Sequence, residues 1–200
     1  MELQKQINDG LELRVTERTA ALEQALSELS GAHQQLSELN RRDDLTGLFN
    51  RQTLNEELHR SLVQAVRSQR PMAILMMDLD HFKQVNDHHG HLAGDACLQH
   101  AAQRLQQRLR AGDLLARFGG EEFVAVLSDT DLTGARDLAA QLRDDLARHP
   151  CIYQGQAIDL TISIGVCAGI PDSADSEQLL QRADQALYRA KAAGRNRVEC

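Results

Sequence analysis

Residues 72–80 read Met-Ala-Ile-Leu-Met-Met-Asp-Leu-Asp, a short apolar run that ends in two acidic residues. A run of this length directly after Pro71 is typical of a buried strand. Alternate residues of a strand share a face, so Asp78 and Asp80 are expected on the same side. Carboxylates there need water or a cation as partner, because an unpaired buried charge is costly. Mg²⁺ is a candidate, and a strand that simply emerges into solvent is the alternative.

A second acidic stretch, at residues 117–123, reads Arg-Phe-Gly-Gly-Glu-Glu-Phe. The paired glycines lie between two short extended segments, residues 114–118 and 123–127, and this pattern predicts a hairpin. In an extended chain the adjacent acids point to opposite faces, so one of them is free to face a metal. Taken alone, the stretch is also compatible with a tight polar hairpin. Together with Asp78 it matches a phosphoryl-transfer site whose carboxylates come from two distant segments.

The remainder of residues 41–200 alternates between helical and extended patterns. Apolar residues recur at helical spacing in four segments, residues 53–68, 94–110, 132–147 and 176–193. Residues 158–166 alternate between apolar and polar side chains, which predicts one half-buried strand. The sequence therefore predicts a single domain of the α/β or α+β class over residues 41–200.

Residues 1–40 differ in composition and contain neither proline nor an aromatic residue. Apolar residues recur every seven positions at what would be the d positions of a coiled coil, namely Val15, Leu22, Leu29 and Leu36. The corresponding a positions are largely polar, which lowers stability and can select the partner. We expect a helical stalk that forms a homodimer or binds a regulatory protein. The alternative is a lone amphipathic helix that packs on its own domain.

Composition excludes several classes of function. The chain has 200 residues and a formal charge of −7, and phosphate binding along nucleic acid favours a positive surface instead. Six aromatic residues without tryptophan are too few for a base-stacking platform. The apolar run is far shorter than the ~20 residues that span a bilayer. The four cysteines show no zinc-type spacing. We expect a cytoplasmic protein that acts on a small molecule, without a membrane segment or a nucleic-acid partner.

Gly119-Gly120-Glu121-Glu122-Phe123 resembles the signature of the GGDEF family of diguanylate cyclases, in its glutamate variant. Other stretches resemble further motifs of that family, in the same order along the chain: residues 43–51, 78–87, 90–95 and 186–196. Separated motifs in the right order are far more specific than any one of them. The similarity covers about residues 41–200.

The resemblance implies an α+β fold with a mostly antiparallel central sheet wrapped by helices. It implies that two GTP molecules are condensed into cyclic di-GMP with release of two pyrophosphates. It also implies two Mg²⁺ ions per GTP site, or Mn²⁺ in their place. The catalytic and metal-binding positions that it assigns are Asp78, Glu121 and Glu122, together with the carbonyl of Leu79.

The nucleotide-binding positions follow from the same resemblance. Those for guanine are Asn86 and Asp95, whose groups can pair with O6, N1 and N2 in a way that adenine cannot match. Those for phosphate and ribose are His81, Phe82, Lys83, Gly120, Lys191 and Arg195. Lys191 and Arg195 lie four residues apart, so one helical face could present both to a triphosphate. Their alternative role is a solvated basic turn that complements the helix dipole.

Arg110 and Asp113 have the Arg-x-x-Asp spacing and position of the family's inhibitory product site, which binds cyclic di-GMP. Arginine offers a planar fork to phosphate and guanine, and aspartate accepts from guanine. A second arginine often completes such a site, and Arg136 and Arg143 are candidates. The alternative is an accidental helix end followed by a turn, since the spacing is common.

The resemblance also implies that one domain holds one GTP, so the reaction requires two facing domains, and a dimeric stalk would raise their effective concentration. Two other functions are compatible with the sequence. One is a non-catalytic module that binds cyclic di-GMP or GTP. The other is a scaffold that binds a partner through residues 1–40.

Overall fold

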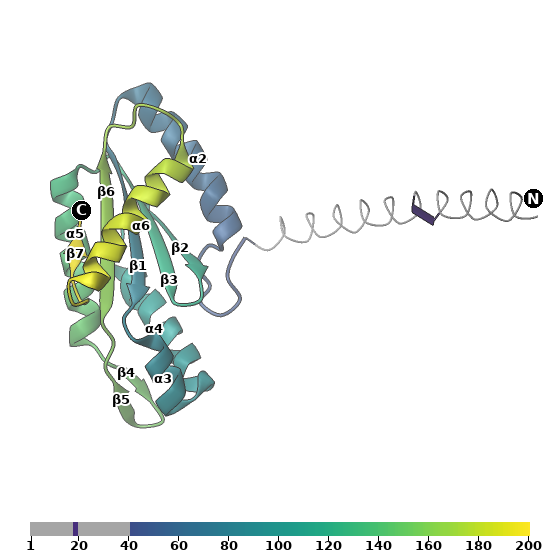
Figure 1. The fold of residues 1–200 in the computed structure, drawn as a ribbon, viewed down its shortest axis with the longest axis vertical. Coiled ribbons are helices and arrows are strands. Elements are labelled where there is room, and N and C mark those ends of the chain that lie inside the picture. The colour runs from purple at the N-terminus through teal and green to yellow at the C-terminus, as the bar shows by residue number, and fades with distance from the viewer. Residues whose placement is uncertain (1–17, 20–40) are drawn as a thin grey trace, which may run out of the picture. The chain divides into compact units, whose positions relative to one another are not determined.

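Residues 18–19 and 41–200 are described by the computed structural model of this protein (Figure 1). Arg18 and Thr19 are helical and exposed, and the rest of the predicted stalk, residues 1–17 and 20–40, lies outside the described residues. Contacts within the chain divide it into two units, Met1–Arg41 and Arg42–Cys200. The second unit contains the sheet and the two acidic stretches described above.

In this second unit a central sheet has the strand order β2-β3-β1-β6-β7. Its strands are β1 (Met72–Leu79), β2 (Leu114–Gly119), β3 (Glu122–Ser128), β6 (Ile162–Gly169) and β7 (Val198–Glu199). Neighbouring strands are antiparallel except for β6 and β7, which are parallel. The predicted strand is confirmed as β1, and it lies between β3 and β6. The mostly antiparallel sheet confirms the predicted α+β class.

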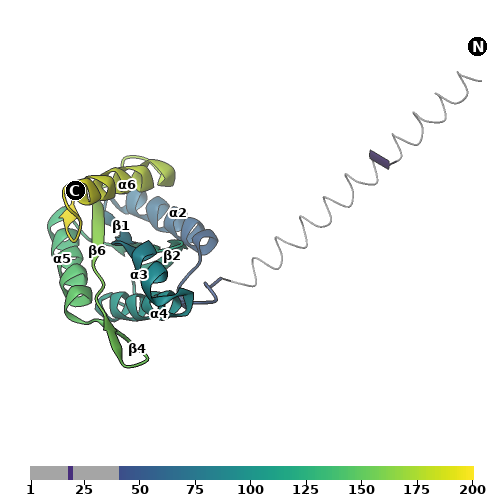
Figure 2. The same cartoon turned by 60° about the horizontal axis from the view of Figure 1, so that its bottom comes forward.

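Five helices of the described residues surround the sheet: α2 (Arg51–Ser68), α3 (Phe82–His89), α4 (His91–Arg108), α5 (Leu132–Arg148) and α6 (Ser176–Ala192). A separate hairpin consists of β4 (Cys151–Tyr153) and β5 (Gln156–Ile158). Figure 2 shows α2 and α6 along one side of the sheet and α4 along the other.

The two faces of β1 belong to two different hydrophobic cores. Its odd-numbered residues, such as Leu75 and Met77, pack with α4 and α5. Its even-numbered residues, such as Ile74 and Met76, pack with α2 and α6. Because strand residues alternate between faces, Asp78 lies on the side that α2 and α6 cover.

Gly165 allows α6 to lie directly on the sheet. A Cβ atom at this position of β6 would overlap the carbonyl oxygen of Ala183 and the backbone nitrogen of Leu187. Glycine is therefore required here by close backbone approach. At its start α6 is capped by Asp175, whose carboxylate accepts from the Gln178 backbone N–H at 3.1 Å. Gly165 thus sets how closely α6 approaches the sheet, and Asp175 stabilises the start of the helix.

Three details of the predicted elements are corrected. Residues 158–166 do not form one strand, because Ile158 ends β5 and β6 begins at Ile162. The two parts belong to different sheets, because β5 pairs with β4 in the separate hairpin whereas β6 pairs with β1 in the central sheet. The final helix ends at Ala192, one residue earlier than predicted, and α3 is a helix that the sequence did not identify.

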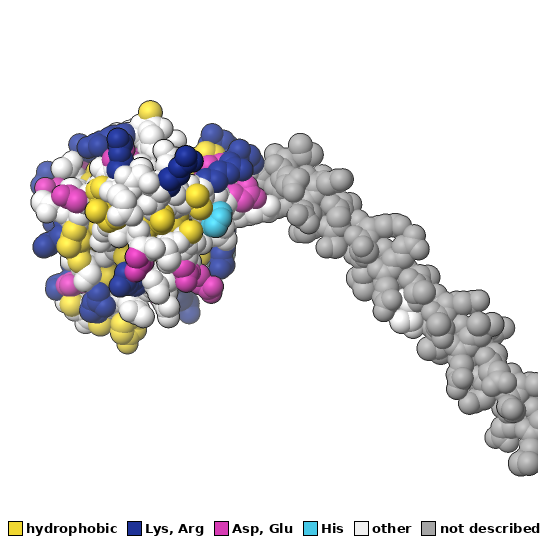
Figure 3. Space-filling model, turned by 90° about the horizontal axis from the view of Figure 1, so that it is seen from above, with side chains coloured by type: hydrophobic (Ala, Val, Ile, Leu, Met, Phe, Trp, Pro, Cys, Tyr) yellow, Lys and Arg dark blue, Asp and Glu magenta, His cyan; other side chains and the backbone are white. Residues whose placement is uncertain are grey.

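The surface of the unit carries charges of both signs. Figure 3 shows basic, acidic and hydrophobic side chains interspersed on one face, without a region of a single sign. Within the part of the chain that the structure describes, no helix combines the length and the apolar character needed to cross a bilayer.

Candidate active site

The two acidic stretches predicted to meet lie next to each other at the carboxyl end of β1. Asp78 of β1 is directly opposite Glu122 of β3 in the antiparallel register. The Leu79 N–H donates to the Glu121 carbonyl at 3.3 Å, so the tip of the β2–β3 hairpin contacts the end of β1. The structure therefore brings Asp78, Leu79, Glu121 and Glu122 together, although more than forty residues separate the two segments.

Lys191 of α6 is the cation that the structure pairs with this acidic group. Its Nζ lies 2.8 Å from Asp78 Oδ2, and Asp78 is only 7% exposed. Burial raises the pKa of Asp78 although Lys191 and the more distant Arg195 both lower it, and Asp80 raises it further. One lysine therefore does not compensate for burial of this carboxylate.

Both glutamates of the hairpin have raised pKa values. Burial and the nearby Asp78 raise the pKa of Glu121, and Lys191 only partly opposes them. Burial, Asp78 and Asp184 likewise raise the pKa of Glu122, against Lys191 and Arg51. Three carboxylates thus share too little positive charge, which is a chemical environment suited to a divalent cation.

The oxygen donors fit Mg²⁺ better than a metal held entirely by protein. Among the described residues, no group of three or more acidic, histidine or cysteine side chains is already arranged as a metal cage. Mg²⁺ needs no such cage, because it typically binds through one or two carboxylates together with water and substrate phosphates. Asp78, Glu121 and the Leu79 carbonyl are of the hard-oxygen type that this ion prefers.

Asp80 has a structural role, which the sequence did not reveal. Its carboxylate accepts hydrogen bonds from the hydroxyl of Thr161 at 2.8 Å and of Ser163 at 2.6 Å, and from the Asn196 N–H at 3.0 Å. These bonds join the end of β1 to β6 and to the loop that follows α6. Asp80 is consequently occupied by protein donors, whereas Asp78 faces the two glutamates and Lys191.

Arg117 supports the glycine turn, and the sequence did not identify it as a functional candidate. Its guanidinium donates to the Gly120 carbonyl at 2.8 and 2.9 Å, and to Asp43 at 3.1 Å. Burial opposes the charge of Asp43, but the bonds from Thr46 and Arg117 lower the pKa of this carboxyl below its usual range. Gly120 has φ of +51°, a conformation that favours glycine. Arg117 therefore stabilises the turn before Glu121, and it is itself bound by Asp43, which lies 74 positions earlier in the sequence.

Three of the residues predicted to bind phosphate or ribose lie at the start of α3, immediately after β1: His81, Phe82 and Lys83. His81 precedes the helix with φ of +57°, and Phe82 is buried at 5% exposure in the core. Lys83 is exposed on the first turn. Backbone N–H groups at a helix start face outward, which makes this a suitable place for an anion.

The predicted guanine-side residues lie on two helices in close contact. Asn86 belongs to α3, and Asp95 belongs to α4 and is exposed. Between them lies Gly94, where an added Cβ would overlap the Asn86 Oδ1 atom. Gly94 therefore allows the Asn86 amide to lie against α4, beside Asp95.

The prediction that one helical face presents Lys191 and Arg195 is wrong. Helix α6 ends at Ala192, and Arg195 adopts φ of +62° in the loop beyond Gly194. The Arg195 N–H still donates to the Ala190 carbonyl at 3.0 Å, so the loop folds back onto the helix end. Both cations act electrostatically on Asp78, but they reach it from a helix and from a loop.

Arg110 and Asp113 line a cavity of about 300 Å³, whose wall also includes Phe49 and Leu115. The Arg110 N–H donates to Asp113 Oδ2 at 3.0 Å, which closes the turn between them. Arg136 and Arg143, predicted as completing residues, do not line this cavity. They line a separate groove with Arg197 and Glu199.

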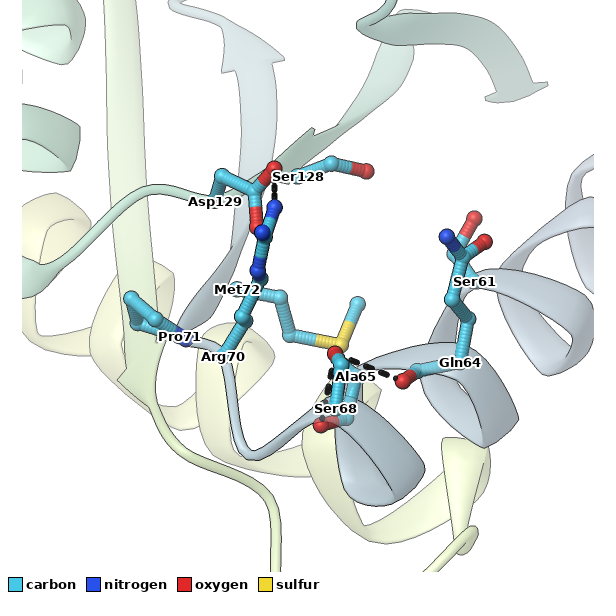
Figure 4. Close-up of a pocket in the computed structure, with 9 residues that line it drawn as sticks. All are labelled: Ser61, Gln64, Ala65, Ser68, Arg70, Pro71, Met72, Ser128 and Asp129. Carbon is cyan, nitrogen blue, oxygen red and sulfur yellow. Dashed lines mark hydrogen bonds and ion pairs between the residues drawn. The ribbon is translucent and has the colours of Figure 1, made fainter.

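Another cavity of about 300 Å³ lies at the opposite end of β1, between α2 and the end of β3 (Figure 4). Its wall includes Met72 and Ser128, which pair with each other in the sheet. The pair Asp78–Glu122 lies six residues further along β1, or roughly 20 Å at ~3.4 Å per residue. At its edge, Arg70 and Asp129 form an ion pair at 3.1 Å. This cavity is therefore separate from the carboxylates.

The family of the chain follows from comparison with known proteins. A family described as "Diguanylate cyclase, GGDEF domain" matches residues 40–197. The chain belongs to this family. Diguanylate cyclase DgcP of Pseudomonas aeruginosa is 45% identical to this GGDEF domain over 157 residues, which are 78% of this chain and 23% of DgcP. The chain thus spans about a quarter of that relative's length.

Solved structures of two GGDEF proteins resemble the whole chain. The coiled coil and GGDEF domain of DgcB from Caulobacter crescentus, in complex with c-di-GMP, has a TM-score of 0.75 at 27% identity, covering 94% of this chain and 98% of that one. Diguanylate cyclase SiaD from Pseudomonas aeruginosa, in complex with its activator SiaC, has a TM-score of 0.76 at 32% identity, covering 98% and 78%. The resemblance inferred from the motifs is thereby confirmed.

Proposed function

We propose that this chain is an active diguanylate cyclase, which condenses two GTP molecules into cyclic di-GMP and two pyrophosphates. One observation carries the proposal: Asp78 and the two signature glutamates converge beside Lys191 with raised pKa values. A carboxylate group left short of positive charge is typical of a site that binds a cation together with an anionic substrate.

Two Mg²⁺ ions, or Mn²⁺ in their place, would be held by Asp78, Glu121 and the Leu79 carbonyl, with Glu122 adjacent. When bound, the metal supplies charge neutralisation of the phosphates for in-line attack. Lys191 forms an ion pair with Asp78 at 2.8 Å. Its flexible side chain also allows it to bind the β- and γ-phosphates of GTP, together with Arg195 and Lys83.

Guanine is selected by Asn86 and Asp95 in this proposal. An amide and a carboxylate together match the acceptor O6 and the donors N1 and N2 of guanine, and adenine would leave these groups unpaired. The position of the Asn86 amide against Gly94 supports this role, because Gly94 directly precedes Asp95 in α4. The N–H groups of His81 and Phe82 contact the phosphates, and Gly120 leaves room for the ribose.

The attacking 3′-hydroxyl and the attacked α-phosphate belong to different GTP molecules, so two domains must face each other. Residues 1–40 would form the homodimeric stalk that brings them together, and the likeness to a coiled-coil GGDEF protein supports this. A regulatory protein could act on the same stalk, as the printed description of the SiaD complex suggests for that relative. Cyclic di-GMP bound at Arg110 and Asp113 would inhibit the enzyme.

A GTP assay tests this proposal directly. The purified chain is incubated with GTP and Mg²⁺ over a range of protein concentrations, and pyrophosphate and cyclic di-GMP are quantified. We expect both products at a 2:1 ratio, and a specific rate that falls steeply with dilution when residues 1–40 are removed. A chain that binds GTP without releasing pyrophosphate is a binding module, and this result would refute the enzymatic proposal.

A further inference from the structure

The cavity beside Arg110 has a basic residue that the Arg-x-x-Asp pattern does not include. Its wall contains Arg42, the first residue of the unit Arg42–Cys200, together with Arg110 and Asp113. Phe49 and the apolar side chains of Leu48, Leu109 and Leu115 complete much of the wall. The cavity therefore combines two guanidinium groups, one carboxylate and an aromatic ring within about 300 Å³.

Arg42 is held by its own segment in a defined position. Its Nη1 donates to the Gly47 carbonyl at 2.6 Å, and its guanidinium carbon lies 5.1 Å from the centre of the Phe49 ring. Phe49 is fixed in turn, because its N–H donates to the Leu115 carbonyl at 3.3 Å and its carbonyl accepts from the Arg117 N–H at 2.9 Å. In the described part of the chain, the Nε and Nη2 atoms of Arg42 have no hydrogen bond, so they remain available to a ligand.

We propose that Arg42 is the second arginine of the product-binding cavity and that it binds a phosphate of cyclic di-GMP together with Arg110. This inference rests on the feedback site of the proposed function, and it names the residue that completes that site. A cyclic dinucleotide carries two phosphodiester anions, which match the two arginine forks. Asp113 accepts from the guanine edge.

The alternative arginines are engaged elsewhere. Arg136 and Arg143 line the groove formed with Arg197 and Glu199, and Arg143 is paired with Asp144 at 2.5 Å. Neither lines the cavity that contains Arg110. Arg42 is consequently the arginine that the fold supplies to Arg110 from within the same domain.

Product bound by Arg42 would restrain the segment that supports the catalytic turn. The next residue, Asp43, binds Arg117, which also holds the Gly120 carbonyl. The ligand would therefore be attached one residue from Asp43, which supports the signature hairpin through Arg117.

Calorimetric titration of cyclic di-GMP into the full chain, freed of bound nucleotide, tests this inference. We expect Arg42→Ala to raise Kd about 10-fold or more, as for loss of a charge-assisted hydrogen bond. Arg42→Lys should recover only part of the affinity, because lysine lacks the planar fork. Arg42→Gln keeps a donor for the Gly47 carbonyl, so it reports loss of the ligand contact with less disturbance of the segment. Arg136→Ala is the matched control and should bind as the parent does.

The outcomes separate this inference from the proposed feedback site. If Arg110→Ala weakens binding while Arg42→Ala and Arg42→Gln bind like the parent, the role of Arg42 is refuted and the feedback site stands. If Arg110→Ala itself binds like the parent, the feedback site is refuted. If Arg136→Ala weakens binding as much as Arg42→Ala, the ligand lies outside this cavity and the inference is wrong. Thermal unfolding of each variant, measured on the same samples, excludes loss of the fold as the cause of weak binding.

Discussion

Asp78 and Asp145 are both buried carboxylates, at 7% and 4% exposure, but their surroundings differ in charge. Arg104 binds Asp145 through Nη2 at 2.6 Å, and Arg108 donates to the same carboxylate through Nε at 3.1 Å. Although burial opposes ionisation, these two arginines lower the pKa of Asp145. At Asp78 burial raises the pKa, and the opposing charges of Lys191 and Arg195 do not compensate for it.

The difference separates a structural carboxylate from one suited to binding a ligand. Asp145 joins α5 to α4 through complete pairing, so a ligand would have nothing to add there. The region around Asp78 is short of positive charge, and this shortage is met when a cation binds. Among the described carboxyl groups, those with raised pKa values are Asp78, Glu121 and Glu122, so a raised carboxyl pKa coincides with the proposed active site, whereas burial alone does not.

The largest expected effect concerns catalysis. Glu121→Ala and Glu122→Ala should each lower the turnover of GTP by about 1,000-fold, because each removes an oxygen ligand or a base from the metal-dependent step. Asp145→Asn should retain turnover within a few-fold of the parent at a temperature where it is folded. Pyrophosphate release at saturating GTP is the measurement. Retained turnover in both glutamate variants would show that the acidic residues around Asp78 do not form the active site.

A smaller effect is expected on stability at Asp145. Asp145→Asn leaves two arginines without their charged partner, and should lower the free energy of unfolding by about 2 kcal/mol. The value is below that for fully buried pairs because the Arg108 side chain is 47% exposed. A carboxyl whose pKa is lowered by folding stabilises the folded state when the pH is above its unfolded-state pKa. This stabilisation is lost as the pH falls through the folded-state pKa. Urea unfolding of the parent and variant should therefore show a smaller difference in the free energy of unfolding at pH 3 than at pH 7.

The preference for GTP over ATP should depend on the position of Asn86 and not on the carboxylates around Asp78 or Asp145. Gly94→Ala displaces the Asn86 amide without changing any charge, so we expect KM for GTP to rise about 10-fold, or ~1.4 kcal/mol, while kcat changes less. Steady-state kinetics with GTP and ATP provide the measurement, and the preference for GTP should decrease. An unchanged KM would show that Asn86 does not bind guanine. Gly112→Ala is a matched control, since a Cβ there has no atom within 4 Å.

The smallest effect is a gain in stability at the active site. Because burial and Asp78 raise the pKa of Glu121, its ionised form destabilises the folded state at high pH, and this cost disappears as the pH falls below the unfolded-state value. Without divalent cations, Glu121→Gln should therefore raise Tm by about 1–3 °C at pH 8 and by less at pH 4.5. Differential scanning calorimetry with EDTA would measure the shift. A Tm of Glu121→Gln below that of the parent at pH 8 would show that the ionised Glu121 does not destabilise the folded state.

The sequence was most informative where one local pattern carried the signal. The apolar run of β1 and the glycine pair of the hairpin predicted the two elements that carry the carboxylates, and the family motifs predicted that they meet. It was least informative about long-range pairs. Nothing local connects Arg117 to Asp43 or Arg104 to Asp145, because each side chain alone reads as an ordinary surface charge.

Other errors have equally physical causes. The alternation in residues 158–166 reports burial, so it could not show that Ile158 ends a strand of the hairpin and Ile162 begins a strand of the central sheet. The spacing of Lys191 and Arg195 suggested a shared helical face, but the left-handed turn after Gly194 depends on backbone contacts with the helix end. The stalk prediction lies outside the described residues, apart from Arg18 and Thr19, and stays a prediction.

Binding of a divalent cation is the most direct test of the proposed active site. Mn²⁺ is titrated into the full chain with a non-hydrolysable GTP analogue, and free Mn²⁺ is followed by electron paramagnetic resonance. We expect the parent and Asp145→Asn to bind two ions per GTP site, and Asp78→Asn and Glu121→Gln to bind them at least 10-fold more weakly. Equal Mn²⁺ binding by the parent, Asp78→Asn and Glu121→Gln would show that these two acidic stretches do not form the metal site.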